Sequence, residues 1–174
     1  KASELTPIPQ MDELIEWLGE NLPEDDGKVS LVHGDYRLDN LMFDQDNHTV
    51  IAVLDWELST LGHPYADLAY QCMGMRLPAA DKQGTSSGLL GVDAAALGIP
   101  SEQDYVDSYC ARMGIDKIGN WSFYLAFSFF RLAAICQGVA KRAADGNASS
   151  KSAGGVAAMV QPLAVNALSI IQEA

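Results

Sequence analysis

Basic residues are scarce in this sequence. Its 174 residues include 11 Lys and Arg against 23 Asp and Glu, so the formal net charge is -12. A charge of this sign opposes binding to the phosphate backbone of nucleic acids and to anionic membrane surfaces, because both attract proteins mainly through Lys and Arg. We therefore expect no nucleic-acid partner and no membrane partner, and we expect the surface to favour cations.

Cysteine is scarce as well. Cys72, Cys110 and Cys136 are odd in number, widely spaced and outside any C-x-x-C pair. This pattern argues against a disulfide framework and against a zinc site, and it is typical of a protein in a reducing compartment. The three side chains are expected in the core.

Long apolar runs are also missing. The most apolar run is FYLAFSFF, which is followed by Arg131. It is shorter than the roughly 20 residues that cross a bilayer. The sequence starts with KASELTPIPQ, which lacks the basic-then-apolar order of a signal peptide. These absences predict a cytoplasmic protein.

What is present is the composition of an ordinary globular domain, with 48% hydrophobic and 20% charged residues. Apolar residues at helical spacing predict a first helix over residues 12–22. Three β-branched or aliphatic runs, at 29–33, 40–43 and 49–56, predict short strands, and the turn-rich DQDNH joins the last two into a hairpin.

The pattern becomes helical after Pro64. We expect four further helices, at residues 65–75, 101–113, 121–144 and about 155–174. Two segments are expected to be loops: residues 77–100, which contain QGTSSGLLG, and the polar ADGNASSKSAGG near 144–155. The sequence therefore predicts one domain over residues 1–174 with an α+β fold that is mostly helical.

Polar side chains stand at the ends of the short apolar runs. The stretch VHGDYRLDNL carries Asp35 and Asn40 in the spacing D-x-x-x-x-N, and VLDWE, after the hairpin, carries Asp55. Protein kinases place a catalytic Asp, a metal-binding Asn and a metal-binding Asp in this order. Phosphoryl transfer needs a carboxylate beside the attacking hydroxyl and hard oxygen ligands that hold Mg²⁺ against the ATP phosphates. A hairpin can place the carboxylate and the metal ligands next to each other, because its two ends lie side by side.

The stretches HGDYRLDN, VLDWELSTLG and ADLAY resemble the aminoglycoside phosphotransferase and choline kinase family, in which an HGD-x-x-x-x-N loop and an hhDWE or hhDWD strand end occur in this order. They are most similar to the branch of that family found with acyl-CoA dehydrogenases. The resemblance is dense over residues 32–70 and general over the rest. It implies a protein kinase-like C-terminal lobe in which a small β-hairpin carries the active site.

The resemblance also implies a role for each matched residue. Asp35 corresponds to the catalytic general base or hydroxyl-orienting carboxylate, and Asn40 and Asp55 correspond to the Mg²⁺ ligands. His33 corresponds to a residue that packs beneath the loop and hydrogen-bonds the backbone. Asp67 corresponds to a helix acid that accepts hydrogen bonds from the catalytic loop, so both of these support the site structurally.

The roles of three residues stay open. Arg37 follows the base by two residues, where its guanidinium can reach the transferred phosphoryl group or form a surface ion pair. Glu57 can orient Trp56, approach the metal or bind substrate. His63 stands where the family commonly has Asp in a GDP turn.

A phosphate-binding segment is absent. The sequence has no G-x-x-x-x-G-K-[ST] motif and no kinase-type Gly-rich loop, and only 32 residues precede His33, with no strand-borne Lys among them. In the family that the chain resembles, the nucleotide-clamping lobe comes before this region. We therefore expect a C-terminal lobe that is nearly inactive alone and that can self-associate through the surface which the other lobe would cover.

Two other classes compete with a kinase. DWELS after VIAVL imitates the nucleophile loop of haloacid-dehalogenase-type phosphatases, with Asp55 as nucleophile, but G-H-P-Y-A-D follows too soon to leave room for a parallel crossover. The other alternative is a catalytically incompetent kinase-like module that only binds partners. It accounts for the missing lobe but not for the presence of Asp35, Asn40 and Asp55 together.

The expected function is transfer of the γ-phosphate of ATP, with Mg²⁺, to a hydroxyl of a small molecule. The acceptor stays open. The negative charge suits a cationic acceptor such as an aminoglycoside or a choline-like amine. Similarity to the acyl-CoA dehydrogenase-associated branch implies instead a hydroxyacyl substrate, whose anionic carrier needs basic groups that this lobe scarcely supplies.

Overall fold

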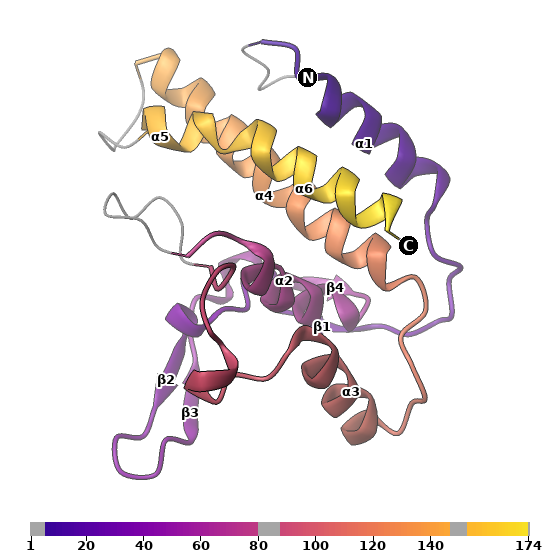
Figure 1. Ribbon diagram of the computed structural model, residues 1–174, viewed down its shortest axis with the longest axis vertical. Coiled ribbons are helices and arrows are strands. Elements are labelled where there is room, and N and C mark those ends of the chain that lie inside the picture. Colours follow the sequence, from indigo (N-terminus) through magenta and orange to yellow (C-terminus); the bar gives the residue numbers. More distant parts are fainter. Residues whose placement is uncertain (1–5, 80–87, 147–152, 174) are drawn as a thin grey trace.

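The computed structural model describes residues 6–79, 88–146 and 153–173. Three helices lie side by side along one side of the molecule (Figure 1): α1 (Pro9–Glu20), α4 (Trp121–Ala144) and α6 (Val160–Gln172). α4 and α6 run antiparallel and pack most closely on each other, and α1 packs against both. The strands and two further helices, α2 (Tyr65–Arg76) and α3 (Glu102–Met113), lie on the other side.

The core lies between α4 and the helices around it. Leu14 of α1, Cys72 of α2, and Leu125 and Phe129 of α4 have almost no exposed surface. All three cysteines are buried and free, which confirms their expected place in the core. α4 and residues 155–172 are also long and apolar enough to cross a bilayer, a test that buried core helices pass equally.

Four of the expected helices are confirmed, and the last one needs a correction. The expected helix over 155–174 is divided into α5 (Ala153–Ala158) and α6. Pro162 explains the break, because proline cannot donate to the carbonyl of Ala158 and its ring clashes there, whereas it is tolerated in the first turn of a new helix. Ser101 caps α3 by accepting a hydrogen bond of 3.1 Å from the backbone N–H of Asp104.

The strands form two antiparallel pairs, one nested inside the other. The expected hairpin is present as β2 (Leu41–Phe43) and β3 (Val50–Val53). Outside it, β1 (Ser30–Val32) pairs with β4 (Thr60–Gly62), a strand that the sequence did not predict. The outer pair therefore brings the chain entering the hairpin and the chain leaving it to the same place.

The two expected loops are only partly described. Residues 80–87 and 147–152 lie outside the described residues. The described flanks of the first loop are ordered against α2, since the N–H of Leu89 donates to the carbonyl of Gly74 at 3.0 Å and a 3₁₀ turn, η3 (Ala95–Leu97), precedes α3. The flanks of this segment therefore form a loop, as expected, and hydrogen bonds hold this loop against α2.

Candidate active site

The loop after β1 is held by a carboxylate from α2. Asp67 lies in the first turn of α2, and its Oδ2 accepts a hydrogen bond of 2.6 Å from the backbone N–H of His33. Its Oδ1 accepts a second bond of 2.9 Å from the N–H of Gly34. One side chain thus fixes two successive peptide units immediately before Asp35.

Gly34 lets this loop pack closely on the chain that leaves the hairpin. Its φ is +83°, a left-handed value that favours glycine. A Cβ atom added there would lie 2.5 Å from the carbonyl oxygen of Leu58. The position therefore requires glycine for two reasons, backbone conformation and space.

His33 is buried under the loop, with 2% of its surface exposed. Its Nδ1 accepts a hydrogen bond of 3.2 Å from the N–H of Asp35, so its Nε2 is the atom that donates to the carbonyl of Leu54 at 2.7 Å. The ring also lies 4.7 Å from the ring of Trp56. Because both nitrogens bind protein atoms, this histidine has no nitrogen left for a substrate.

Asp35 and Asn40 are joined to each other. The Nδ2 amide of Asn40 donates to the carbonyl oxygen of Asp35 at 2.9 Å and to its Oδ2 at 3.0 Å. Both bonds use the amide nitrogen, and no described residue donates a hydrogen bond to Oδ1 of Asn40. The amide therefore orients the carboxylate while its own oxygen stays available as a ligand.

Asp55 stands next to this pair. The N–H of Leu54 donates to the carbonyl of Asn40 at 2.8 Å, which ties the two ends of the hairpin together. Asp55 itself adopts a left-handed conformation, φ 64° and ψ 55°, which Asp tolerates better than most residues. Its carboxylate is exposed and forms no hydrogen bond with any described residue.

The side-chain oxygens of Asn40 and Asp55 are suited to Mg²⁺ more than to a metal ion coordinated by protein alone. Within the described residues no group of three His, Cys, Asp or Glu side chains could hold a metal ion. Mg²⁺, however, is commonly bound through one or two carboxylates together with substrate phosphates and water. Asn40 and Asp55 fit that smaller requirement.

Two of the open positions lie at the edge of the site. Nε of Arg37 donates to Oδ2 of Asp39 at 2.9 Å and Nη2 contacts the same oxygen, so the structure shows the surface ion pair. This bond, with the nearby charge of Asp35, raises the pKa of Arg37. Glu57 lies exposed in the 3₁₀ turn η2 (Trp56–Leu58), and its side chain forms no hydrogen bond with a described residue.

Tyr70 is a neighbour of the site that the sequence analysis did not identify. It follows Asp67 by three residues on α2, which places both side chains on one face of the helix. Burial, together with hydrogen bonding to the adjacent Asp35 carboxylate, raises the pKa of Tyr70 to about 12. The hydroxyl is therefore protonated at neutral pH. The sequence signal that could have identified Tyr70 is its position at the end of ADLAY.

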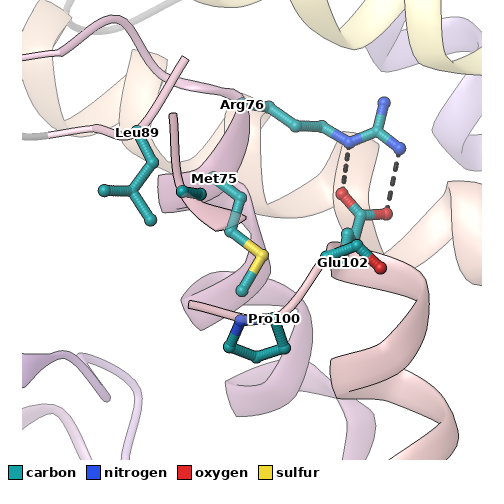
Figure 2. Close-up of a pocket in the computed structure, with 7 residues that line it drawn as sticks. Met75, Arg76, Leu89, Pro100 and Glu102 are labelled. Carbon is teal, nitrogen blue, oxygen red and sulfur yellow. Dashed lines mark hydrogen bonds and ion pairs between the residues drawn. The ribbon is translucent and has the colours of Figure 1, made fainter. Parts of the chain in front are cut away.

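A cavity of about 340 Å³ lies at the opposite end of α2. Figure 2 shows Arg76 and Glu102 facing each other there, with hydrogen bonds of 2.5 and 2.9 Å between them. Trp121 Nε1 also donates to Glu102 at 3.1 Å. Because Glu102 is occupied by these two partners, the pair joins α2, α3 and α4 and has a structural role.

Comparisons with known proteins agree with this geometry. The model of the phosphotransferase enzyme family matches residues 1–95. The chain is 47% identical to a protein from Ralstonia eutropha provisionally assigned as an aminoglycoside phosphotransferase, and their structures superpose with a TM-score of 0.89 over 99% of this chain and 51% of that one. The expected fold, mostly helical with small antiparallel sheets on a kinase-like plan, is confirmed.

Curated relatives of this chain are longer proteins whose names refer to another activity. Acyl-CoA dehydrogenase family member 10 of Mus musculus is 51% identical over 88% of this chain. Acyl-CoA dehydrogenase family member 11 of Homo sapiens is 44% identical over 94% of it. The chain spans 14% and 20% of their respective lengths. The similarity therefore concerns one part of those proteins.

Proposed function

Because the chain belongs to the phosphotransferase enzyme family, we propose that it is the catalytic lobe of an ATP-dependent kinase that phosphorylates a hydroxyl group of a small molecule. The observation that supports this most directly is the linked set of Asp35, Asn40 and Asp55. One amide joins the first two, and a backbone hydrogen bond between Leu54 and Asn40 brings the third alongside. If these residues only capped turns or ended strands, their side chains would not have to lie together.

Each residue has a distinct task in this proposal. Asp35 accepts a hydrogen bond from the acceptor hydroxyl and takes its proton as the phosphoryl group is transferred. The amide of Asn40 holds the Asp35 carboxylate in one orientation. Oδ1 of Asn40 and the carboxylate of Asp55 would hold Mg²⁺, which when bound neutralises charge on the nucleotide phosphates. Asp67 and His33 keep the loop in place.

The rest of the active site is proposed to come from sequence outside these 174 residues. Relatives are much longer than this chain, and no Gly-rich phosphate loop occurs in it. Leu31 and Leu61, paired across β1 and β4, are 60% and 74% exposed, which suits a surface covered by another part of the protein. We expect the isolated chain to be nearly inactive and to self-associate through this surface.

We further propose a cytoplasmic protein that acts on small molecules, without nucleic-acid or membrane partners. The charge of -12 supports this proposal, since it opposes binding to polyanions. The two apolar helices do not argue against it: half of the α4 stretch is buried in the fold.

The decisive experiment compares two aspartates in the natural protein that contains this chain. Asp35→Ala should lower ATP-dependent phosphorylation of hydroxyl acceptors about 10²- to 10⁴-fold, the usual loss of a positioned acid or base. Asp46→Ala, an exposed aspartate in the hairpin turn, should leave the rate unchanged. Equal rates for the Asp35 variant and the parent protein would refute the assignment. Binding of MgATP without turnover of any acceptor would favour a kinase-like binding module instead.

A further inference from the structure

His63 is the third residue whose role the sequence leaves open, and the phosphoryl-transfer chemistry proposed above does not use it. It lies between β4 and α2. Its carbonyl accepts a hydrogen bond of 3.1 Å from the N–H of Ala66, so its backbone begins the first turn of the helix. Pro64, the N-cap residue of α2, makes no side-chain capping bond. The position of this helix end therefore depends in part on what the His63 side chain contacts.

The imidazole of His63 contacts three segments of the chain. Its Nδ1 accepts a hydrogen bond of 3.5 Å from the N–H of Tyr65, so its Nε2 carries the proton and donates to Oδ1 of Asp26 at 3.3 Å. The ring lies 4.5 Å from the ring of Tyr65 and is stacked at 5.3 Å on the ring of Tyr124 in α4. Because both hydrogen bonds are long, the ring contacts also help to hold the imidazole in place.

Asp26 is itself fixed by Lys28. The Nζ of Lys28 donates to Oδ2 of Asp26 at 2.6 Å, and the N–H of Lys28 donates to Oδ1 at 3.0 Å. These bonds lower the pKa of Asp26 to about 2, so its carboxylate is charged at neutral pH. The same Nζ lies 3.5 Å from the hydroxyl of Tyr65 and 5.7 Å from the centre of its ring. Asp26 and Lys28 therefore attach the segment before β1 to the start of α2.

The contacts of His63 and those of Asp67 lie at opposite ends of β1. The β1–β4 ladder begins at the pair Ser30–Gly62, next to His63, and ends beside the loop that Asp67 holds. α2 is thus attached to the chain that enters β1 and to the chain that leaves it. Because Asp67 follows His63 by only four residues, a shift of the helix start moves its carboxylate relative to the two N–H groups that it binds.

We propose that His63 is a positioning residue of phosphoryl transfer. By joining Asp26 to the start of α2, it sets where Asp67 meets the loop that carries Asp35. This inference rests on the proposed kinase function and adds to it a residue that touches neither substrate nor metal. Misplacement of a reacting group by about 1 Å can cost about 10²-fold in rate, so weak contacts at this helix end can still influence turnover.

Substitutions of His63 in the natural protein that contains this chain separate its contacts. His63→Phe keeps an aromatic ring at this position and removes both hydrogen bonds. His63→Asn places an oxygen near the position of Nδ1, and His63→Gln places an NH₂ group near that of Nε2, so each restores one of the two bonds. Asp26→Ala removes the acceptor of the second bond instead.

Tyr109→Phe is the matched control. Tyr109 of α3 packs against Tyr65 at 6.2 Å between ring centres, and its hydroxyl forms no hydrogen bond with a described residue. The substitution therefore removes one polar atom from the same aromatic cluster without touching the contacts of His63. Its exchange and activity should equal those of the parent protein.

The first measurement is hydrogen–deuterium exchange over residues 30–40. In His63→Phe, the amides of His33 and Gly34 should exchange about 3- to 10-fold faster, as expected for the loss of weak neutral hydrogen bonds. The Asn and Gln variants should lie between His63→Phe and the parent. Asp26→Ala should act in the same direction and add little to His63→Phe, because the two residues share one contact.

The second measurement is turnover of MgATP with kanamycin, choline and 3-hydroxybutyrate as acceptors. For an acceptor that the parent phosphorylates, His63→Phe should lower kcat about 3- to 10-fold and leave KM for MgATP unchanged. Unchanged exchange in His63→Phe would overturn the inference. Faster exchange with an unchanged kcat would overturn it too, because the contacts would then only stabilise the fold. Fully additive losses in the double variant would show that His63 and Asp26 do not act through one contact.

Failure of the kinase proposal is separable from failure of this inference. If the parent phosphorylates none of the three acceptors, exchange alone decides on His63. Faster exchange confined to residues 30–40 and the first turn of α2 would support the inference. Faster exchange of equal size in α1, α4 and α6 would show general destabilisation and rule it out.

Discussion

Replacing Asp67 by Asn tests how the loop that carries Asp35 is held in place. The carboxylate of Asp67 accepts one hydrogen bond at each oxygen, from the backbone N–H of His33 at 2.6 Å and of Gly34 at 2.9 Å. Asparagine has the same shape but only one oxygen, so its NH₂ group must face one of these two N–H donors. The substitution therefore changes hydrogen bonding with almost no change in volume.

The expected loss of loop stability is large for so small a change in the side chain. A hydrogen bond to a charged group contributes about 1.5–3 kcal/mol, and a buried N–H left unpaired costs about 1–3 kcal/mol. With partial relaxation of the loop we expect a total of about 2–4 kcal/mol in the free energy of local opening. Each 1.4 kcal/mol changes an equilibrium tenfold, so the amides of His33 and Gly34 should exchange with deuterium about 30- to 1,000-fold faster.

Hydrogen–deuterium exchange measured over residues 30–40 of the natural protein provides the assay. Glu16→Gln, on the exposed face of α1, removes one carboxylate elsewhere and should leave this peptide unchanged. The rate of phosphorylation should fall together with the protection from exchange, because Asp35 follows Gly34 directly. Wild-type exchange rates at His33 and Gly34 in the Asp67→Asn protein would show that Asp67 does not hold the loop.

Three further substitutions address Gly34, the proposed metal ligand Asp55 and the ion pair between Arg76 and Glu102. Gly34→Ala should destabilise the loop by at least about 1–3 kcal/mol, because its left-handed φ and the neighbouring carbonyl both oppose a side chain; an unchanged melting temperature and activity would contradict the close packing of the loop on Leu58. Asp55→Asn should lower activity and raise the Mg²⁺ concentration needed, with partial recovery in Mn²⁺; an unaltered Mg²⁺ dependence would remove Asp55 from the metal site. Burial raises the pKa of Glu102, but hydrogen bonds from Arg76 and Trp121 outweigh it and leave the pKa below 4.5. The stabilisation is therefore present above pH 4.5 and is lost as the pH falls through the lowered value, so Glu102→Gln should cost about 1–2 kcal/mol at pH 7 and less in acid; a cost that does not depend on pH would contradict this account.

Much of the fold could be predicted because its signals are local. Apolar periodicity marks α1 to α4, and the turn-rich DQDNH marks the β2–β3 hairpin. The order of Asp35, Asn40 and Asp55 around that hairpin predicted their proximity, since a hairpin returns the chain to its starting point. Pro162 was also a local signal, and its effect on the last helix was overlooked.

Other features depend on contacts between distant segments. β4 is three residues long and has no strand pattern of its own; it is a strand because β1 offers it backbone partners. Arg37 alone permits either a phosphate contact or a surface ion pair, and the folded loop pairs it with Asp39.

The sequence alone determined the residues of the candidate site and the elements that carry them. Tertiary structure decided which distant side chains meet. Arg131 of α4 lies over the ring of Tyr70 in α2, and His63 contacts Asp26, although the separate patterns of these segments do not predict either pair. Periodicity describes which face of a helix is buried, whereas the partner of that face depends on how the helices pack, and that packing is a property of the whole chain.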